Sequence, residues 1–335
     1  MIDFRYHIVS LISVFLALAV GISLGAGPLK ETIGDTLTGQ VDQLRQDRDA
    51  LRTDLGASRR AQANQGAFIA ATAPELLSGA LTGRRVAVVT LGTVAGGVAD
   101  GVSTQLVAAG ATVSGRVAVT DRWTDPSLRS FRQALAGNLV TYLSPAPAQN
   151  AGPEVELAEA LVQGLTGANP TAPDKPSDSA GLILALLANA DSKLITVADG
   201  VSAPADAIVV LTGSGPVKPN ATPPPADVVA SQVAIASAAQ DRSAGVVIAG
   251  ADVVVGDLVS TILADGDLAK NLTTVSAVEQ VAGQVSVPLA LNVRIGGSAG
   301  HYGFRDGEKP LPERVALQPV NRTPFQVPAG VGAAG

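Results

Sequence analysis

The sequence predicts an α/β fold that is preceded by a membrane anchor and a helical stalk. Three features carry this prediction: an uncharged apolar run, a polar segment with leucines at seven-residue spacing, and an alternation of β-branched runs with helical patterns from Arg84 onward. Such an alternation with short connections is typical of a doubly wound, mostly parallel sheet of the Rossmann or flavodoxin type. We therefore divide the chain into an anchor (1–29), a coiled-coil stalk (30–71), an α/β domain (72–306) and a disordered tail (307–335).

The anchor is the apolar run at residues 8–26. It is long enough to cross a bilayer as a helix, because about 20 residues at 1.5 Å rise span a hydrocarbon core of about 30 Å. Its only polar side chains are serines, whose hydroxyls can bond back to helix carbonyls. A cleaved signal peptide is one alternative, although Asp3 opposes Arg5 in what would be its basic region. A buried core helix is the other.

Two patterns predict that the chain pairs with itself. Within the anchor, small residues recur every four positions and form a face on which two helices can approach closely: Ala17, Gly21 and Gly25. Within the stalk, apolar residues follow a heptad pattern: Leu37, Val41, Leu44, Leu51 and Leu55. Arg48 occupies the remaining seam position, and the seam fades into polar residues after Leu55. We expect a parallel homodimer, with a lone amphipathic helix as the alternative.

The α/β domain is predicted from runs of alternating character. Residues 84–91 form a nearly continuous β-branched run, which is typical of a strand buried on both faces of a parallel sheet. Further strands are expected at residues 111–119, 193–198, 207–212, 245–250 and 272–278. Helices are expected at residues 98–109, 123–136, 154–165, 179–190, 227–240, 256–263 and 281–293. The helix at 123–136 has the clearest start signal, with Thr124 or Asp125 as N-cap and Pro126 at its first position. Residues 144–153, 167–179 and 213–226 are rich in Pro, Ala and Gly and are expected to be loops.

The sequence contains few residues or motifs that could bind a metal, a cofactor or a nucleic acid, or carry out catalysis. The chain has no cysteine, one methionine and two histidines, so it lacks the thiolate and thioether ligands that copper(I) prefers. The turn at residues 92–97 matches neither nucleotide-binding glycine pattern, and we expect no cofactor. Residues 296–300 match G-x-S-x-G but follow a predicted helix instead of a strand, so we expect no enzyme and no catalytic residue. The net charge of −6 and the lack of a basic cluster predict no nucleic-acid partner.

One late motif of unknown role stands out: Gly300, His301, Tyr302 and Gly303. Glycine lets the backbone turn, while imidazole and phenol offer polar contacts. One interpretation is a structural turn in which both side chains cap backbone groups. The other is a functional site, in which His301 is a weak candidate for a metal ligand when it is repeated across an oligomer.

Four segments together carry a family resemblance: the opening MIDFRYHIVSLISVFLALAVGISLGAGPL, the stalk segment QVDQLRQDRDAL, the strand GRRVAVVTL and the late GGSAGHYG. They resemble the actinobacterial MctB family, which is named for mycobacterial copper transport protein B. The resemblance covers residues 1–303. It implies an envelope protein with an extracytoplasmic C-terminal domain, linked to copper efflux and homeostasis and described as pore-forming in the outer membrane.

The resemblance also implies a second role. Corynebacterial relatives act with a partner membrane protein in cell division and in the control of peptidoglycan hydrolysis. Two functions therefore follow: a copper-transport component without a ligand-rich copper site of its own, or a non-catalytic dimeric scaffold for a membrane or cell-wall protein. The outer membrane is implied by the family name and not by the sequence.

Overall fold

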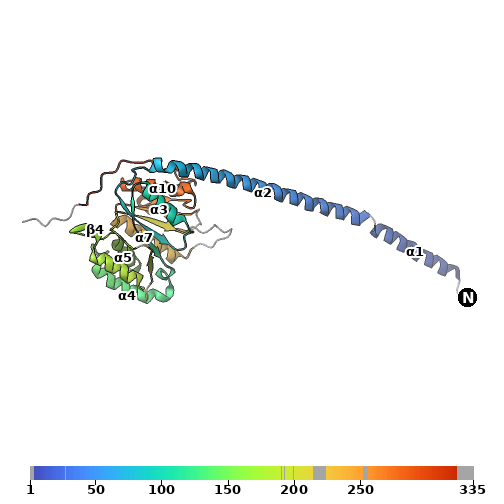
Figure 1. The fold of residues 1–335 in the computed structure, drawn as a ribbon. Helices are drawn as coiled ribbons and strands as arrows, with labels where there is room; N and C mark the ends of the chain where they lie inside the picture. Colours follow the sequence, from blue (N-terminus) through green and yellow to red (C-terminus); the bar gives the residue numbers. More distant parts are fainter. Residues whose placement is uncertain are drawn as a thin grey trace, which may run out of the picture. The chain divides into compact units, whose positions relative to one another are not determined.

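The computed structural model describes residues 4–26, 28–189, 191, 193–198, 200–213, 224–251 and 256–322. The chain separates into two compact units, Met1–Gln65 and Gly66–Gly335. The first contains helix α1 (Phe4–Ala26) and most of helix α2 (Pro28–Leu77), and the second contains the sheet and the remaining helices (Figure 1).

Helix α1 is the predicted anchor. Residues Phe4–Ser23 have a mean hydropathy of 2.0 and are entirely unburied. By length and composition this is the one helix among the described residues that could cross a membrane. Apolar side chains therefore face outward all around it, as a lipid-facing helix requires.

Helix α2 is longer than the predicted stalk. It continues to Leu77, and from Gly66 onward it belongs to the second unit. Near its end the helix becomes part of the core of the second unit, where Ala73 and Leu77 are buried. Pro74 lies in the last turn, where it cannot donate an amide hydrogen bond to the preceding turn, and the helix ends three residues later at Leu77.

A seven-stranded sheet forms the centre of the second unit, with the order β5-β2-β1-β6-β7-β8-β9. Its strands are β1 (Arg85–Leu91), β2 (Thr112–Val119), β5 (Ile195–Val197), β6 (Ala207–Thr212), β7 (Val246–Gly250), β8 (Thr273–Val275) and β9 (His301–Tyr302). All neighbours are parallel except β5, which runs antiparallel to β2. The prediction of a mostly parallel sheet is confirmed.

Helices cover both faces of this sheet because its central strands are apolar on both sides (Figure 1). Val86 and Val88 of β1 face α3 (Val98–Ala108), α10 (Val281–Ile295) and the end of α2. Val89 and Leu91, on the opposite face, pack in the core formed with α4 (Arg129–Leu139), α5 (Pro153–Thr166), α6 (Asp178–Ala188), α7 (Ala226–Arg242) and α8 (Leu258–Ala264). A short helix, α9 (Gly266–Asn271), follows α8.

The helix expected at residues 123–136 begins later than its start signal indicates. Asp125 accepts a hydrogen bond from the Ser127 amide at 2.8 Å, but it caps a 3₁₀ turn, Pro126–Leu128. A further 3₁₀ turn, Asp121–Trp123, precedes it, and α4 starts only at Arg129. The strong capping signal therefore marks a short 3₁₀ turn that leads into the helix, a common use of such turns.

The expected loop at 167–179 is wrong in part, because it contains a small hairpin of β3 (Ala168–Asn169) and β4 (Ala172–Pro176). The Asn169 side-chain oxygen accepts from the amides of Thr171 and Ala172 and closes the turn between the strands. Ser177 then caps α6 through a 3.1 Å bond from the Ala180 amide. In the predicted excursion at 213–226, residues 214–223 lie outside the described residues.

Residues 307–322, which belong to the expected disordered tail, make defined hydrogen bonds to the rest of the second unit. Buried Asn292 of α10 donates to the Val315 carbonyl at 3.1 Å and accepts from the Val315 amide at 2.8 Å. The Asn292 side chain also donates to the Ala80 carbonyl at 2.7 Å, and Arg314 donates to the Ser78 carbonyl. This segment therefore fastens the turn after α2 to α10, although it forms no helix. Residues 323–335 lie outside the described part of the chain.

Candidate functional site

The Gly300–Gly303 motif forms the edge of the sheet. Strand β9 pairs in parallel with β8, so that His301 lies beside Thr274 and Tyr302 beside Val275. The imidazole Nε2 lies 3.1 Å from the Ala269 carbonyl, and Nδ1 lies 2.9 Å from the Thr274 hydroxyl. Because a carbonyl only accepts, Nε2 carries the proton and Nδ1 accepts from Thr274. Both ring nitrogens are therefore occupied by protein groups.

The imidazole of His301 is half-buried, and this favours its neutral form. Burial lowers the pKa of His301, because the charged ring would lose its solvation, and this effect is partly opposed by the Ala269 carbonyl and by the charge of Glu308. The neutral tautomer with the proton on Nε2 is the form that satisfies both neighbours. His301 is thus placed as a structural connector between β9, β8 and the end of α9.

The other three residues of the motif have steric roles. A side chain on Gly300 would bring its Cβ to 2.5 Å from the Tyr302 hydroxyl, and one on Gly303 would clash with the Ser276 hydroxyl and the Glu308 carboxylate. Tyr302 is buried, and burial raises the pKa of its phenol, with a smaller contribution from Glu313. The glycines therefore allow the chain to pass close to its neighbours.

A buried carboxylate, that of Glu308, lies beside the motif. Glu308 accepts from the Ser276 hydroxyl at 2.7 Å, from the Arg305 amide at 3.2 Å and from the Arg305 guanidinium at 3.1 Å. Its side chain is only 2% exposed, so these donors replace the water that a buried charge would lose. Glu308 and Ser276 are not among the residues predicted from the sequence, since nothing in their local pattern reveals a contact across 32 residues.

These residues do not assemble a metal centre. Among the residues that the structure describes, no group of three or more His, Cys, Asp or Glu side chains is placed to hold a metal ion. His301 has no co-ligand within this set, and both of its nitrogens are bonded. Within one chain the described residues thus offer His301 no co-ligand, and its role as a weak ligand repeated across an oligomer stays a prediction.

A cavity lies at the carboxyl ends of β1 and β2, where α/β sheets commonly bind ligands. It has a volume of about 460 Å³ and is lined by the loop at 92–97, Thr90 and Thr196. A second cavity of about 500 Å³ lies along α3 and β2. Asp100 and Arg116 line both cavities and form an ion pair of 2.8 Å.

The chemistry of the first cavity is limited. Its described lining contains no histidine, and its two charged side chains, Asp100 and Arg116, neutralise each other. A nucleophile with an adjacent base, as covalent catalysis of acyl transfer uses, is not found in that lining. In the sequence, the feature that could have indicated this cavity is Arg116, because it is a charged residue in the middle of a predicted strand.

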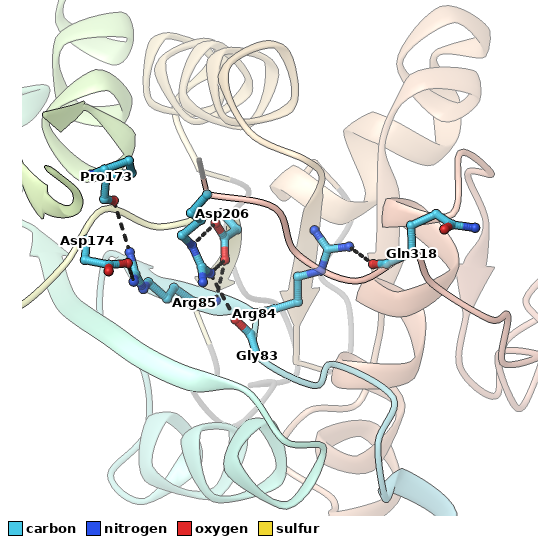
Figure 2. Close-up of polar contacts among 8 residues, drawn as sticks. Gly83, Arg84, Arg85, Pro173, Asp174, Asp206 and Gln318 are labelled. Carbon is cyan, nitrogen blue, oxygen red and sulfur yellow. Dashed lines mark hydrogen bonds and ion pairs between the residues drawn. The ribbon is translucent and has the colours of Figure 1, made fainter. Parts of the chain in front are cut away.

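A polar network lies where β1 and β6 begin, at the end of these strands opposite to the first cavity. Asp206 accepts from the Arg85 amide at 2.7 Å, and the Arg85 guanidinium contacts Asp174 (Figure 2). Arg84 donates to the Gln318 carbonyl at 2.9 Å. The network therefore fixes the tail segment to the sheet.

The predicted pairing residues lie on the surface of the first unit. Ala17, Gly21 and Gly25 of α1 are exposed, and a Cβ added at either glycine would have no neighbour within 4 Å. The stalk residues Leu37, Val41, Leu44, Leu51 and Leu55 are between 43% and 69% exposed. The first unit therefore presents an apolar stripe that its own side chains do not cover.

Comparisons with known proteins cover nearly the whole chain. A family model described as copper transport outer membrane protein, MctB, matches residues 1–312. Proteins named copper transporter MctB from Mycobacterium bovis and from two strains of Mycobacterium tuberculosis are each 28% identical over 319 residues. These alignments cover 92% of this chain and 98% of each relative.

Proposed function

The chain belongs to the MctB family, and from this membership we propose that it is a membrane-anchored envelope protein that acts in copper transport or homeostasis. The observation that carries the proposal is the family match over residues 1–312, which includes both the apolar helix α1 and the sheet. The apolar helix supports the anchor, and the family description supports a place in the envelope.

We propose further that the chain contributes to copper handling without a ligand-rich site of its own. Two observations support this: the lack of a metal-ligating cluster among the described residues, and the engagement of both His301 nitrogens. The one apolar helix found among the described residues encloses no polar pathway by itself, so a pore would need several copies or another protein. Copper would then be handled by an assembly.

A deletion strain tests the copper proposal. We expect it to be more sensitive to copper and to accumulate more of the metal, and the parent gene on a plasmid should restore both. A complementing His301→Gln variant should restore them equally well. Unchanged sensitivity and accumulation in the deletion strain would contradict a copper role, and failure of a folded His301 variant would contradict the lack of a histidine site.

The second candidate function is a non-catalytic scaffold that binds a partner membrane protein in cell division and in the regulation of peptidoglycan hydrolysis. One observation favours it, namely the uncovered apolar stripe of α2. We propose that this stripe is a coiled-coil stalk, and that the second unit, whose central strand β1 lies between β2 and β6, is a Rossmann-like domain with an antiparallel edge strand.

The scaffold function is tested by charge placed on or off the stripe. Leu44→Asp with Leu51→Asp should produce division defects and altered sensitivity to cell-wall hydrolysis, with copper tolerance unchanged. Gln46→Asp with Thr53→Asp places the same charge outside the stripe and should leave division normal. Normal division in a strain with the first pair of substitutions would contradict the scaffold.

A further inference from the structure

The exposed stripe of α2 has a defined heptad geometry. Val41, Arg48 and Leu55 form one row, and Leu37, Leu44 and Leu51 form the other, so that the two rows together make a seam with the spacing of a coiled coil. Each apolar member of this seam is at least 43% exposed in the single chain. The seam lies wholly within the first unit, Met1–Gln65.

Charges of opposite sign flank the two sides of the seam. Of the positions that precede the Val41 row by one residue, the first is Gln40 and the next two carry aspartates, Asp47 and Asp54, which we call the acidic flank. Of the positions that follow the Leu37 row and its continuation by one residue, the first is Thr38 and the next three carry arginines, Arg45, Arg52 and Arg59, which we call the basic flank. All five side chains are exposed. In coiled coils these flanking positions set partner choice and orientation.

We infer that the occupant of this seam is a second copy of the chain, paired in parallel and in register by these flanks. In that arrangement Asp47 meets Arg52 of the second copy and Asp54 meets Arg59 of the second copy, each contact occurring twice by symmetry. An antiparallel pair would instead bring aspartate to aspartate and arginine to arginine. The charge pattern therefore favours one orientation and opposes the other.

The charges within one helix leave room for these contacts. Arg45 pairs with Asp42 at 3.0 Å, and Arg52 lies 3.8 Å from Asp49, both on the same helix. These are exposed pairs, which are weak and easily exchanged for contacts across the seam. The side chains of Asp54 and Arg59 have no hydrogen-bond or ion-pair partner within the described part of the chain.

Arg48 is the one charge inside the seam. Its guanidinium is compensated within its own chain by Asp49, at 2.8 Å. A single polar residue at such a position lowers stability but restricts register and strand number. A shifted register would place Arg48 opposite an apolar residue of the second copy. Arg48 therefore favours the same in-register pairing as the flanking charges.

Orientation and register are tested by cysteine crosslinking of the full chain in membranes. The chain has no cysteine, so Leu44→Cys introduces a single thiol. In a parallel, in-register pair the Cα atoms of the two substituted positions lie about 6 Å apart, a distance that a disulfide spans. We expect a crosslinked dimer from this variant and none from the outward-facing control, Gln46→Cys. Failure of the Leu44 variant to crosslink more than the control would overturn the parallel pairing.

The role of the flanks is tested by charge exchange in the Leu44→Cys background. Asp47→Arg with Asp54→Arg should weaken self-pairing about tenfold, and Arg52→Asp with Arg59→Asp should do the same. A mixture of these two variants, carrying different tags, should pair with each other and recover the crosslink, because every flanking contact is again between opposite charges. Gln46→Arg with Thr53→Arg adds positive charge at outward-facing positions, outside the seam, and serves as the control.

Recovery in the mixture is the result that the inference requires. An equal crosslink in all variants would show that the flanks do not select the partner and would overturn it, as would a mixture that crosslinks no better than either variant alone. The readout does not depend on copper or on cell division. Its outcome is therefore separate from that of either proposed function.

Discussion

Arg322 forms an ion pair with Asp206, 116 residues earlier in the chain, and also donates to the Gly83 carbonyl at 2.9 Å. Asp206 stands just before β6 and Gly83 just before β1, so this contact ties the tail segment to the two central strands where they begin. Both side chains of the pair are mostly buried, at 23% and 19% exposed, so the pair is less screened than a surface pair.

Replacing Arg322 should therefore destabilise the second unit. We expect Arg322→Ala to lower the free energy of unfolding by about 1–3 kcal/mol, because Asp206 would keep its charge and lose its main partner. Chemical denaturation of the full chain in detergent measures this change. Arg129→Ala removes an exposed arginine from α4 and should change stability by less than about 0.5 kcal/mol. Equal effects of the two substitutions would contradict a stabilising tail.

Asn292 is a second point at which the tail is held. Its buried side chain makes three hydrogen bonds to backbone groups of Ala80 and Val315. Asn292→Ala leaves these buried groups without partners and should cost about 2–4 kcal/mol in the free energy of unfolding. Limited proteolysis should then cut the tail near Val315 sooner than in the parent protein. Asn138→Ala, at an exposed position of α4, should change neither measurement.

Parts of the fold follow from the sequence because their signals are local. The strand β6 is observed at Ala207–Thr212, as expected, and β1 lies within the predicted β-branched run. Both strands are buried on both faces, which their continuous apolar residues indicate in the sequence. The strand β9 has two residues and no such run, so its pairing with β8 depends on contacts remote in sequence. Residues 307–322 lack periodicity, which predicts a disordered tail, yet Asn292 and Asp206 hold them through single side chains. Local patterns carry no information about such contacts.

His301 should make stability depend on pH. Burial lowers its pKa in the folded chain below the usual value of about 6.5, so the unfolded chain binds more protons as the pH falls below that value. The stabilising effect of the neutral ring is thus complete above about pH 6.5 and declines as the pH falls toward the lower, folded pKa. Denaturation at pH 7.5 and pH 5.5 should show a larger loss for the parent protein than for His301→Gln. An equal loss in both proteins would contradict burial of the neutral imidazole.

Two glycines should respond to alanine with opposite signs. Gly303 has a φ of 152°, and a Cβ there would clash with Ser276 and Glu308, so Gly303→Ala should destabilise the chain by about 2 kcal/mol or more. Gly137 lies in α4, and a Cβ added there would have nothing within 4 Å, so Gly137→Ala should stabilise the chain by about 0.5–1 kcal/mol. Melting temperatures of the two variants measured against the parent protein check both signs.

Arg48 offers the sharpest test of the seam on α2. Arg48→Leu makes the seam continuously apolar from Leu37 to Leu55, and in a paired stalk two new leucines would be buried. Burial of even part of each side chain should make the paired form survive about 10- to 100-fold greater dilution. Sedimentation of the full chain in detergent across a dilution series measures the change. Arg60→Leu adds the same apolar side chain on the outward face of α2 and should leave the dissociation curve unmoved. If Arg48→Leu behaves like this control, the seam is not where two copies meet, because an apolar residue added to a real interface must strengthen it.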